Sequence, residues 1–456
     1  MPAGRPHPGD VGQLRCDALD DRGAGVGTLS DLRLHIAGAL EGETVQVTIE
    51  HLSPHGAHGW GRLDGVVEAS PLRVRPVCPA HGSCGGCPLQ HLSYEAQVRW
   101  KTQLVANALA QAPALRGVAT LPCVPAPRPL GYRNQAKYVY GAAPGGPPVL
   151  GAYLPRSHRL VDMAGCRVLE APLDAVAGVI RERAAAHGLP PYDERTRAGL
   201  LRHVVARANA TGEVLVTLVT AHDRWADARA FADEIRAAAP AVIGVVQNVN
   251  ATPGNQLYGD DERPLAGRSS LKDAIGSTQV ELSSRSFFQL NRDVAALAYD
   301  AIRSAAAGVS PGCVVDAYAG AGGIAFTLAP IARRVVAIEQ NGAATAAAAA
   351  FARLRGEERV RFVTGDVAEH LTAVGAADVV VLNPPRAGCA RQVLAATAGL
   401  RPRMVAYLSC NPDSLVRDLV ALAGHGLATR TVTPYDMLPH TAHVEALALL
   451  APAQAP

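Results

Sequence analysis

Two residues near the C-terminal end of the chain have side chains suited to covalent chemistry. Cys410 stands in the segment YLSCNPDSL (407–415), directly after an apolar run that predicts a buried strand. A cysteine there is an inert packing residue or, where the strand ends in a crevice, an activated thiolate. Glu445, in PHTAHVEAL, precedes the last apolar strand and can supply a general base at the same sheet edge. Position alone favours packing for Cys410, and the presence of Glu445 favours the nucleophile.

A glycine-rich segment, DAYAGAGG (316–323), lies between an apolar strand and a helix. Backbone N–H groups and a helix N-terminus can approach a ligand at such a turn, although small residues there can equally serve close packing. The next strand ends in Glu339, whose carboxylate can hold ribose hydroxyls, and the strand after it ends at Asp366. Three strand ends with this chemistry predict a nucleoside cofactor site at the carboxyl edge of a parallel sheet.

The residues after the fourth strand decide between two cofactors, because the glycine spacing fits both NAD and S-adenosylmethionine. The segment DVVVLNPPRAG (378–388) places Asn383 and two prolines at that strand end. Two prolines can simply terminate a strand. The combination is nevertheless similar to the Asp/Asn-Pro-Pro motif of class I methyltransferases, in which the polar residue faces both the cofactor and a target base. This resemblance favours S-adenosylmethionine.

A thiolate and a base are the two groups required to methylate carbon 5 of a uracil. That carbon is a poor nucleophile, but addition of a thiolate at C6 gives an enolate whose C5 can attack a sulfonium methyl group. A base then removes the C5 proton, and the thiolate leaves by elimination. Such an enzyme must also take its target base out of any stack.

The apolar patterns divide the chain into three predicted parts. Residues 8–70 contain short alternating runs separated by glycines, which predict a small OB-like antiparallel β-barrel. Residues 71–291 begin with a cysteine-rich junction and continue as a central α+β domain. Residues 292–456 alternate helices with continuously apolar strands, which is typical of a doubly wound parallel sheet. The predicted fold class is α/β, with a class I, Rossmann-like methyltransferase domain in residues 292–456.

The composition is that of a packed protein of two to three domains: of 456 residues, 48% are hydrophobic and 18% charged. The net charge of +3 permits a nucleic-acid partner without requiring one. No apolar run is long enough to span a bilayer, and MPAGRPHPGD lacks the apolar core of a signal peptide. We therefore expect a cytoplasmic protein without a membrane partner. No obligate protein partner is evident, which favours a monomer.

Five segments in the same order make the resemblance to one family specific. They are FFQLN (287–291), DAYAGAGG (316–323), NPPRAG (383–388), YLSCNPDSLVRDL (407–419) and LPHTAHVE (438–445). Together they are similar to the signatures of the RNA 5-methyluridine methyltransferases, over roughly residues 10 to 450. The resemblance implies that Cys410 is the nucleophile and Glu445 the proton acceptor. It also implies contacts with S-adenosylmethionine from Gln289, Tyr318, Gly323, Glu339, Asp366 and Asn383.

Two positions depart from the pattern of this family. Asparagine stands at 383, where the family usually has aspartate, and glycine at 323, where it usually has asparagine. Asn383 can hydrogen-bond in both directions but cannot carry a negative charge. It therefore leaves open a non-catalytic RNA-binding or assembly factor. It also invites comparison with amino methyltransferases, but these have no use for Cys410 and carry an aromatic residue where this chain has Arg386.

A Gly/Pro-rich junction, CPAHGSCGGCPLQH (78–91), contains three cysteines, and a fourth lies far downstream; the set is Cys78, Cys84, Cys87 and Cys166. Four thiolates can hold a zinc ion or an iron–sulfur cluster, and His81 or His91 can replace one of them, so the spacing leaves these alternatives open. The junction resembles the cluster loop of the ribosomal-RNA branch of the same family. That resemblance implies a [4Fe-4S] cluster on the four cysteines, with a structural or RNA-positioning role, because methyl transfer requires no redox step.

The barrel of residues 8–70 resembles the TRAM domain, a small OB-like RNA-binding module. Arg133, Asn134 and Lys137, in GYRNQAKYVY, resemble a family segment near the RNA and the active site, although a solvated strand face offers the same pattern. The barrel and the cysteine junction together favour 23S ribosomal RNA over tRNA as the substrate. The reason is that the bacterial tRNA enzymes of this family resemble only the catalytic part.

Overall fold

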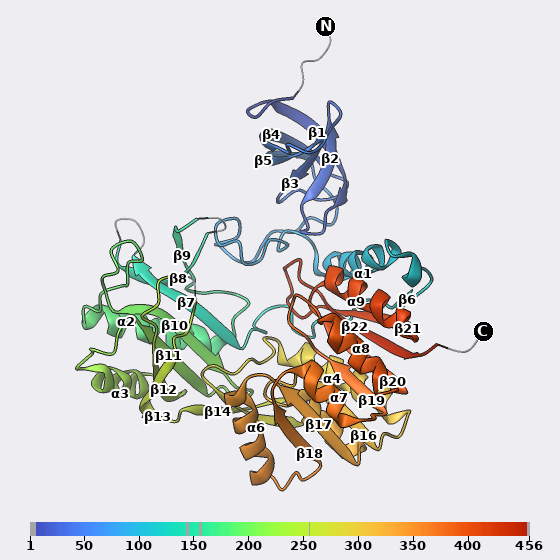
Figure 1. Cartoon of the computed structure of the whole chain (residues 1–456). Coiled ribbons are helices and arrows are strands. Elements are labelled where there is room, and N and C mark those ends of the chain that lie inside the picture. The colour runs from blue at the N-terminus through green and yellow to red at the C-terminus, as the bar shows by residue number, and fades with distance from the viewer. Residues whose placement is uncertain (1–5, 143–145, 155–156, 255, 454–456) are drawn as a thin grey trace. The chain divides into compact units, whose positions relative to one another are not determined.

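The computed structural model describes residues 6–142, 146–154, 157–254 and 256–453 (Figure 1). The chain divides into two compact units. Unit 1 comprises Met1–Leu104 and Leu438–His443, and unit 2 comprises Val105–Met437 and Val444–Pro456. The domain limits that we predict at residues 71 and 292 are finer than this division and stay predictions. Within the described ranges, no helix combines the length and the apolar character needed to cross a membrane.

Unit 1 contains a closed five-stranded barrel in the order β1-β2-β3-β5-β4. Its strands are β1 (Val11–Leu19), β2 (Gly25–Leu29), β3 (Leu32–Ile36), β4 (Thr44–Leu52) and β5 (His58–Glu68). Neighbouring strands are antiparallel, apart from β3 and β5, which run parallel. Alternate side chains, among them Leu14, Cys16, Leu34, Ile36 and Val47, fill the interior. The small barrel predicted from the glycine-punctuated runs is therefore present.

Outside the barrel, a glutamine of helix α1 connects two segments of unit 1. Helix α1 (Tyr94–Ala110) begins after the cysteine junction, and its residues up to Leu104 belong to unit 1. Gln97 on α1 donates its side-chain amide to the carbonyls of Leu89 (3.1 Å) and Leu92 (2.8 Å). Its Oε1 accepts the N–H of His440 (2.9 Å). Gln97 therefore links the junction to the distant segment Leu438–His443, which is also bonded directly to the junction through the N–H of Leu89 and the carbonyl of His440 (3.0 Å).

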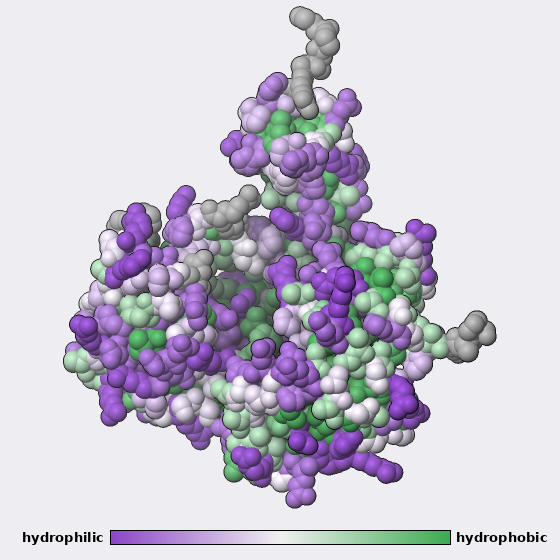
Figure 2. All heavy atoms as spheres, viewed as in Figure 1, coloured by the Kyte–Doolittle hydropathy of each residue, from purple (hydrophilic) through white to green (hydrophobic). Residues whose placement is uncertain are grey.

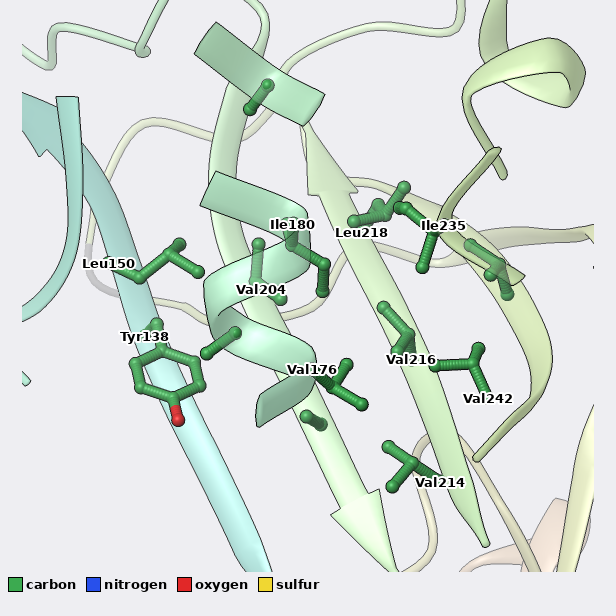
Figure 3. Close-up of a cluster of buried hydrophobic side chains, with 14 of the residues drawn as sticks. Tyr138, Leu150, Val176, Ile180, Val204, Val214, Val216, Leu218, Ile235 and Val242 are labelled. Carbon is green, nitrogen blue, oxygen red and sulfur yellow. The ribbon is translucent and has the colours of Figure 1, made fainter. Parts of the chain in front are cut away.

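The N-terminal part of unit 2 is a seven-stranded sheet in the order β13-β12-β11-β10-β7-β8-β9. The strands are β7 (Gln135–Ala142), β8 (Pro148–Tyr153), β9 (Leu160–Asp162), β10 (Leu201–Ala208), β11 (Val214–Thr220), β12 (Val242–Val249) and β13 (Asp261–Gly267). Helices α2 (Ala171–Ala186) and α3 (Ala228–Ala238) belong to the core on one face, where Val176, Ile180 and Ile235 pack with alternate strand residues such as Val204 and Val216 (Figure 3). A two-stranded ribbon of β14 (Ser270–Ile275) and β15 (Thr278–Ser283) comes next in the chain.

The C-terminal part of unit 2 is an eight-stranded sheet in the order β18-β17-β16-β19-β20-β22-β21-β6. The strands are β6 (Ala119–Thr120), β16 (Cys313–Ala317), β17 (Arg334–Glu339), β18 (Val360–Thr364), β19 (Val379–Leu382), β20 (Met404–Ser409), β21 (Leu427–Tyr435) and β22 (Glu445–Pro452). Strands β16 to β20 run parallel, and β22 lies antiparallel between β20 and β21. The order reverses at β16, between β17 and β19, and ligands of such sheets bind at the carboxyl ends of the strands around this reversal.

Helices alternate with these parallel strands, as predicted for residues 292–456. They are α4 (Arg292–Ala307), α5 (Gly323–Leu328), α6 (Gly342–Leu354), α7 (Val367–Val374), α8 (Arg391–Gly399) and α9 (Pro412–Gly424). Short 3-10 turns are also found in the chain, at Pro113–Leu115 and Ala329–Ile331. Every residue of β19 and β20 is buried. Continuously apolar strands form here because helices cover both faces of a parallel sheet.

A buried ion-pair network fixes the start of α4, directly after the segment FFQLN. Arg292 pairs with the carboxylates of Glu170 and Asp273 (3.2 Å to Asp273) and donates to the carbonyl of Ala208 (2.9 Å). Asn291 caps the helix with its side chain. Because the two carboxylates are buried, their pairing with Arg292 is needed to offset the loss of hydration. The network joins α4 to the seven-stranded sheet and to β14, and holds FFQLN between them.

Candidate active site

A cavity of about 430 Å³ in unit 2 lies at the carboxyl ends of β16, β17, β19 and β20. This volume falls in the range of sites that hold small-molecule ligands. Figure 2 shows the surface of unit 2 hollowed between the part with α2 and α3 and the part with the eight-stranded sheet. The cavity is lined by Phe287, Phe288, Gln289, Tyr299, Tyr318, Ala319, Gly320, Ala321, Gly323, Glu339, Gln340, Asn383, Pro384, Pro385, Arg386, Cys410 and Glu445.

Seven of the eight residues predicted for catalysis or cofactor binding line this one cavity. The exception is Asp366, which is exposed at the start of α7. Its Oδ1 accepts the N–H groups of Ala368 (2.8 Å) and Glu369 (3.2 Å), so the carboxylate caps the helix. The structure thus assigns Asp366 a helix-capping contact, and its predicted contact with a cofactor stays a prediction.

The turn after β16 shapes one end of the cavity. Tyr318 has φ = 65°, and Gly320 and Gly322 have φ = 56° and 83°, so three residues of this turn adopt the left-handed conformation. Glu339, at the end of β17, accepts the N–H groups of Gly320 (2.9 Å) and Asn341 (2.8 Å). These bonds fix the carboxylate at the cavity wall. Each carboxylate oxygen keeps a further lone pair, which can accept a ribose hydroxyl.

Asp316 lies on β16 two residues before Tyr318 and is fully buried. Within the described residues, neither of its carboxylate oxygens makes a hydrogen bond of normal geometry. Burial raises the pKa of Asp316 to about 7, and the nearby charge of Glu339 adds to the rise. A buried carboxyl group in this state is the feature expected next to a site where a ligand brings a positive charge.

Cys410 comes directly after β20 and precedes Asn411, the N-cap of α9. The residue is exposed, so a substrate can reach the sulfur. Burial of the thiol and the charge of Glu445 raise the pKa of Cys410, whereas the charge of Arg386 lowers it. Because the thiolate is the reactive form, Cys410 depends on a positive neighbour. Among the lining residues, Arg386 carries that charge.

Glu445 is the first residue of β22 and pairs with Tyr435 of β21. Its side chain is buried in the wall of the cavity, and this burial raises the pKa of Glu445 to about 8. A carboxyl group with this pKa can both accept a proton and return it to solvent near neutral pH. The two predicted catalytic residues therefore face one cavity, and burial raises the pKa of each, as is common at functional sites.

The ring of Tyr299 on α4 lies close to the glycine at position 323. A Cβ atom at 323 would lie 3.2 Å from Cε2 of Tyr299 and 3.5 Å from its hydroxyl oxygen. Glycine leaves room for this ring, which lines the cavity beside Gln289. Sequence reasoning missed Tyr299. The signal was the helical spacing of apolar residues on α4, whose buried members include Ala295, Ala298, Tyr299 and Ile302.

Two lining residues present groups that a planar base can contact. Phe287 is 72% exposed although it lines the cavity, and an exposed aromatic ring stacks readily on a nucleobase. Local spacing does not indicate this exposure, because Phe287 stands beside the buried Phe288. Asn383 is half-buried at the end of β19, with its backbone N–H directed to the carbonyl of Ala317 (3.4 Å).

The predicted RNA contact of Asn134 is wrong. Asn134 is fully buried, and it donates its side-chain amide to the carbonyl of Gln289 (2.8 Å) and its N–H to the carbonyl of Leu290 (3.1 Å). It therefore positions the FFQLN segment from within the protein. Lys137 is exposed and Arg133 is half-buried, so both can still reach a ligand.

The predicted metal ligands do not form a metal site in the described part of the chain. Cys78, Cys84 and Cys87 are half-buried in unit 1, and Cys166 is half-buried in unit 2. The described residues contain no group of three or more His, Cys, Asp or Glu side chains placed to hold a metal ion. This arrangement gives the [4Fe-4S] cluster no support.

Comparison with known proteins places the chain in a family. A family model described as RNA cap guanine-N2 methyltransferase matches residues 311–392, which contain the glycine turn and NPPRAG. An uncharacterized RNA methyltransferase of Halalkalibacterium halodurans is 37% identical over 446 residues and covers 97% of both chains. This chain belongs to the RNA methyltransferase family. A second such relative, from Geobacter sulfurreducens, is 36% identical over 450 residues, which cover 97% of this chain and 90% of its own.

A solved structure is similar to this RNA methyltransferase over nearly its whole length. It is the tRNA (uracil-54, C5)-methyltransferase of Pyrococcus abyssi, determined in complex with S-adenosyl-L-homocysteine. The two chains are 24% identical with a TM-score of 0.77, and the match covers 96% of this chain and 99% of the other. The likeness shows that this RNA methyltransferase has the same fold.

We predict that Glu445→Gln stabilises this RNA methyltransferase increasingly as the pH rises. Between its usual pKa of 4.5 and the folded value of about 8, Glu445 ionises in the unfolded chain and stays protonated in the folded protein. The free energy of unfolding of the wild type therefore falls with pH in this window. Glutamine removes that dependence, so the difference between variant and wild type should grow by on the order of 4 kcal/mol between pH 5 and pH 9.

Urea unfolding at pH 5, 7 and 9 measures this difference. Glu369→Gln, at an exposed site on α7, is the control and should show the same difference from wild type at each pH. A constant difference for Glu445→Gln across this range would contradict the burial-raised pKa.

Proposed function

We propose that this chain methylates carbon 5 of a uridine in RNA, with S-adenosylmethionine as the methyl donor. The observation that carries the proposal is the meeting of Cys410 and Glu445 in one cavity with the glycine turn and the NPPRAG loop. C5 methylation needs both a nucleophile and a base, whereas methylation of an exocyclic nitrogen has no use for a thiol. Arg386 also stands where amino methyltransferases carry an aromatic residue.

The cavity residues fit S-adenosylmethionine by their chemistry. Glu339 offers carboxylate lone pairs to ribose hydroxyls, and the carboxyl group of Asp316 is buried behind the cavity wall, two residues before Tyr318. Gln289 and Tyr318 add polar groups to the wall. When bound, the cofactor supplies an electrophilic methyl group. The similar Pyrococcus protein was solved with S-adenosyl-L-homocysteine, which supports this choice of ligand.

The residues of the chain perform the remaining steps on the uracil. The Cys410 thiolate, stabilised by the charge of Arg386, bonds to C6 of the ring and makes C5 nucleophilic. Once C5 carries the methyl group, the Glu445 carboxylate takes the C5 proton, the C6–S bond breaks, and the ring double bond re-forms. The exposed ring of Phe287 gives the extracted base a stacking partner at the mouth of the cavity.

For the substrate, we propose 23S ribosomal RNA, with tRNA as the second candidate. The cysteine junction supports ribosomal RNA through its resemblance to that branch of the family. The barrel does not separate the two, because the tRNA (uracil-54, C5)-methyltransferase of Pyrococcus abyssi is similar over 96% of this chain, a span too long to leave the barrel out. That same likeness is the observation that favours tRNA.

RNA that contains 5-fluorouridine tests the nucleophile. With fluorine at C5 there is no C5 proton for the base to remove after methyl transfer. Elimination is therefore blocked, and the bond between Cys410 and C6 persists. With S-adenosylmethionine present, we expect a covalent protein–RNA band on a denaturing gel, with the modified peptide containing Cys410. Cys410→Ala should abolish the band, and Cys123→Ala, at a buried cysteine outside the cavity lining, should keep it. A band that persists in Cys410→Ala would mean that another cysteine is the nucleophile.

The same experiment is extended to substrate choice with methyl-labelled cofactor and unmodified RNA. Label at uridines of 23S ribosomal RNA supports the first candidate, and label confined to tRNA supports the second. Absence of label from every uridine of both RNAs would favour the non-catalytic RNA-binding factor that Asn383 left open.

We also propose that the TRAM-like barrel of unit 1 binds RNA through an aromatic surface. His35 on β3 and Trp60 on β5 are paired, with stacked rings whose centroids lie 6.1 Å apart. His58 lies edge-on to Trp60 at 5.6 Å, and Trp60 is 44% exposed. Such rings hold unpaired bases of any sequence. Electrostatic attraction contributes little to RNA binding at this surface, because residues 6–70 contain four arginines and no lysine but ten aspartates and glutamates.

We predict that Trp60→Ala weakens RNA binding about tenfold without changing its salt dependence, since a stacking contact releases no counterions. Fluorescence anisotropy at several salt concentrations gives both the affinity and the slope. Val67→Ala, also exposed on β5, is the matched control and should leave both unchanged. Equal losses in the two variants, or a reduced salt slope for Trp60→Ala, would exclude a stacking surface.

Finally, we propose a [4Fe-4S] cluster on Cys78, Cys84, Cys87 and Cys166. The support is the resemblance of the junction, together with the partial accessibility of all four cysteines. Anaerobic purification should give a brown protein with about four irons per chain. Cys166→Ser should lower the iron content, and Cys123→Ser should not. Colourless protein with one zinc per chain would overturn the assignment.

A further inference from the structure

Asp418 on α9 is a buried carboxylate for which the proposed reaction has no direct use. Its side chain is 1% exposed. Its Oδ2 accepts the backbone N–H of Cys389 (2.7 Å) and the hydroxyl of Tyr407 (2.5 Å), and its Oδ1 accepts Nε of Arg417 (2.8 Å). Cys389 comes directly after the NPPRAG loop, and Tyr407 precedes Cys410 by three residues on β20. The carboxylate of Asp418 therefore links the NPPRAG loop to β20, which precedes Cys410, and to α9, which follows it.

Two further hydrogen bonds hold the NPPRAG loop against α9. Arg417 donates Nη2 to the carbonyl of Ala387 (2.8 Å), and Asn411 donates Nδ2 to the carbonyl of Arg386 (3.2 Å). Gly388 has φ = 80°, and a Cβ atom there would lie 2.4 Å from Nη2 of Arg417 and 2.5 Å from Oδ2 of Asp418. The approach of the loop to the helix is therefore too close for a side chain at position 388.

The same network reaches the cofactor turn through the side chain of Cys389. This thiol is 6% exposed and lies close to the hydroxyl groups of Tyr407 and Tyr318. Burial raises the pKa of Cys389 to about 12, so the group stays a neutral thiol and is no second nucleophile. Since Tyr318 lines the cavity, contacts run without interruption from the cofactor turn to α9.

We propose that Asp418 is a positioning residue that holds Arg386 beside Cys410. Arg386 reaches the cavity from the loop that Asn411, Arg417 and Asp418 bind at residues 386, 387 and 389. If the loop is released, the positive charge moves away from the sulfur and the thiolate loses its stabilisation. The inference rests on the proposed role of Cys410 as nucleophile.

The sign of the effect separates positioning from simple electrostatics. Removal of the Asp418 carboxylate takes a negative charge from the neighbourhood of Cys410, and by Coulomb's law alone this favours the thiolate. Release of Arg386 does the opposite. A decrease in the thiolate fraction of an Asp418 variant therefore cannot come from the lost charge itself.

The test measures alkylation of Cys410 by iodoacetamide from pH 6 to 10, in the full-length protein without RNA, with the Cys410 peptide quantified by mass spectrometry. The rate tracks the thiolate fraction. We expect Asp418→Asn to slow alkylation at pH 7.5 by about threefold or more, which corresponds to about half a pKa unit. Gly388→Ala displaces the loop without changing any charge, and should slow it likewise.

Two backgrounds make the result decisive. Gly399→Ala, at the end of α8 with open space around its Cβ, is the matched control and should react like the wild type. When Arg386→Gln is also present, neither Asp418→Asn nor Gly388→Ala should slow alkylation further, because the positive charge of Arg386 has already been removed.

Slowing in both variants that disappears in the Arg386→Gln background supports the proposal, and any other pattern overturns it. Thermal unfolding identifies a variant that fails to fold. If Asp418→Asn fails to fold, the alkylation rates of Gly388→Ala, with and without Arg386→Gln, decide the test. The assay needs neither RNA nor methyl transfer. A protein that passes it but forms no adduct with 5-fluorouridine RNA would therefore disprove the proposed function and leave the positioning role intact.

Discussion

The raised pKa of two groups that the proposed reaction must ionise is the constraint on which this site depends. Cys410 and Glu445 share one cavity, and the protein around them raises the pKa of both. The carboxylate of Glu445 also makes the Cys410 thiolate less favourable. A site of this kind needs a positive charge at a fixed place, and Arg386 provides it from the NPPRAG loop. The fixed position of that loop is therefore as important to the chemistry as the two reacting groups.

Long-range contacts build the cavity from elements that lie far apart in the sequence. The parallel strands bring the glycine turn, Glu339, the NPPRAG loop and Cys410 to one sheet edge. The wall opposite them comes from FFQLN, which Asn134 binds from the seven-stranded sheet and which Arg292 fixes at the start of α4. The cavity is therefore complete only when both sheets of unit 2 are folded, although Cys410 and Glu445 lie at adjoining ends of the paired strands β20 and β22.

Features set by the geometry of parallel strands were the most predictable from the sequence. Residues at successive strand ends, such as Glu339, Asn383 and Cys410, converge because those ends share one edge. Side-chain direction was less predictable, because it depends on packing between distant segments. Asp366 caps its own helix, and Asn134 lies inside the protein although Lys137, three residues further on, is exposed.

The roles of Tyr299 and Asp418 were equally hidden. Tyr299 explains Gly323 only through a contact across two helices, and Asp418 gathers partners from β20 and from the segment after β19. Helical spacing indicates that Tyr299 is buried, but the partner in neither contact can be predicted from local spacing or composition. The cysteine junction is the opposite case. Its cysteines form a clear pattern in the sequence, but the described residues contain no metal site built from them.

Release of tritium from RNA labelled at C5 of uridine tests the central claim most directly. The mechanism predicts one tritium released to water for each methyl group transferred, because Glu445 must remove the C5 hydrogen from the adduct that Cys410 forms. It also predicts loss of both signals in Cys410→Ala. Methyl transfer without tritium release would place the methyl group on another atom and contradict the account.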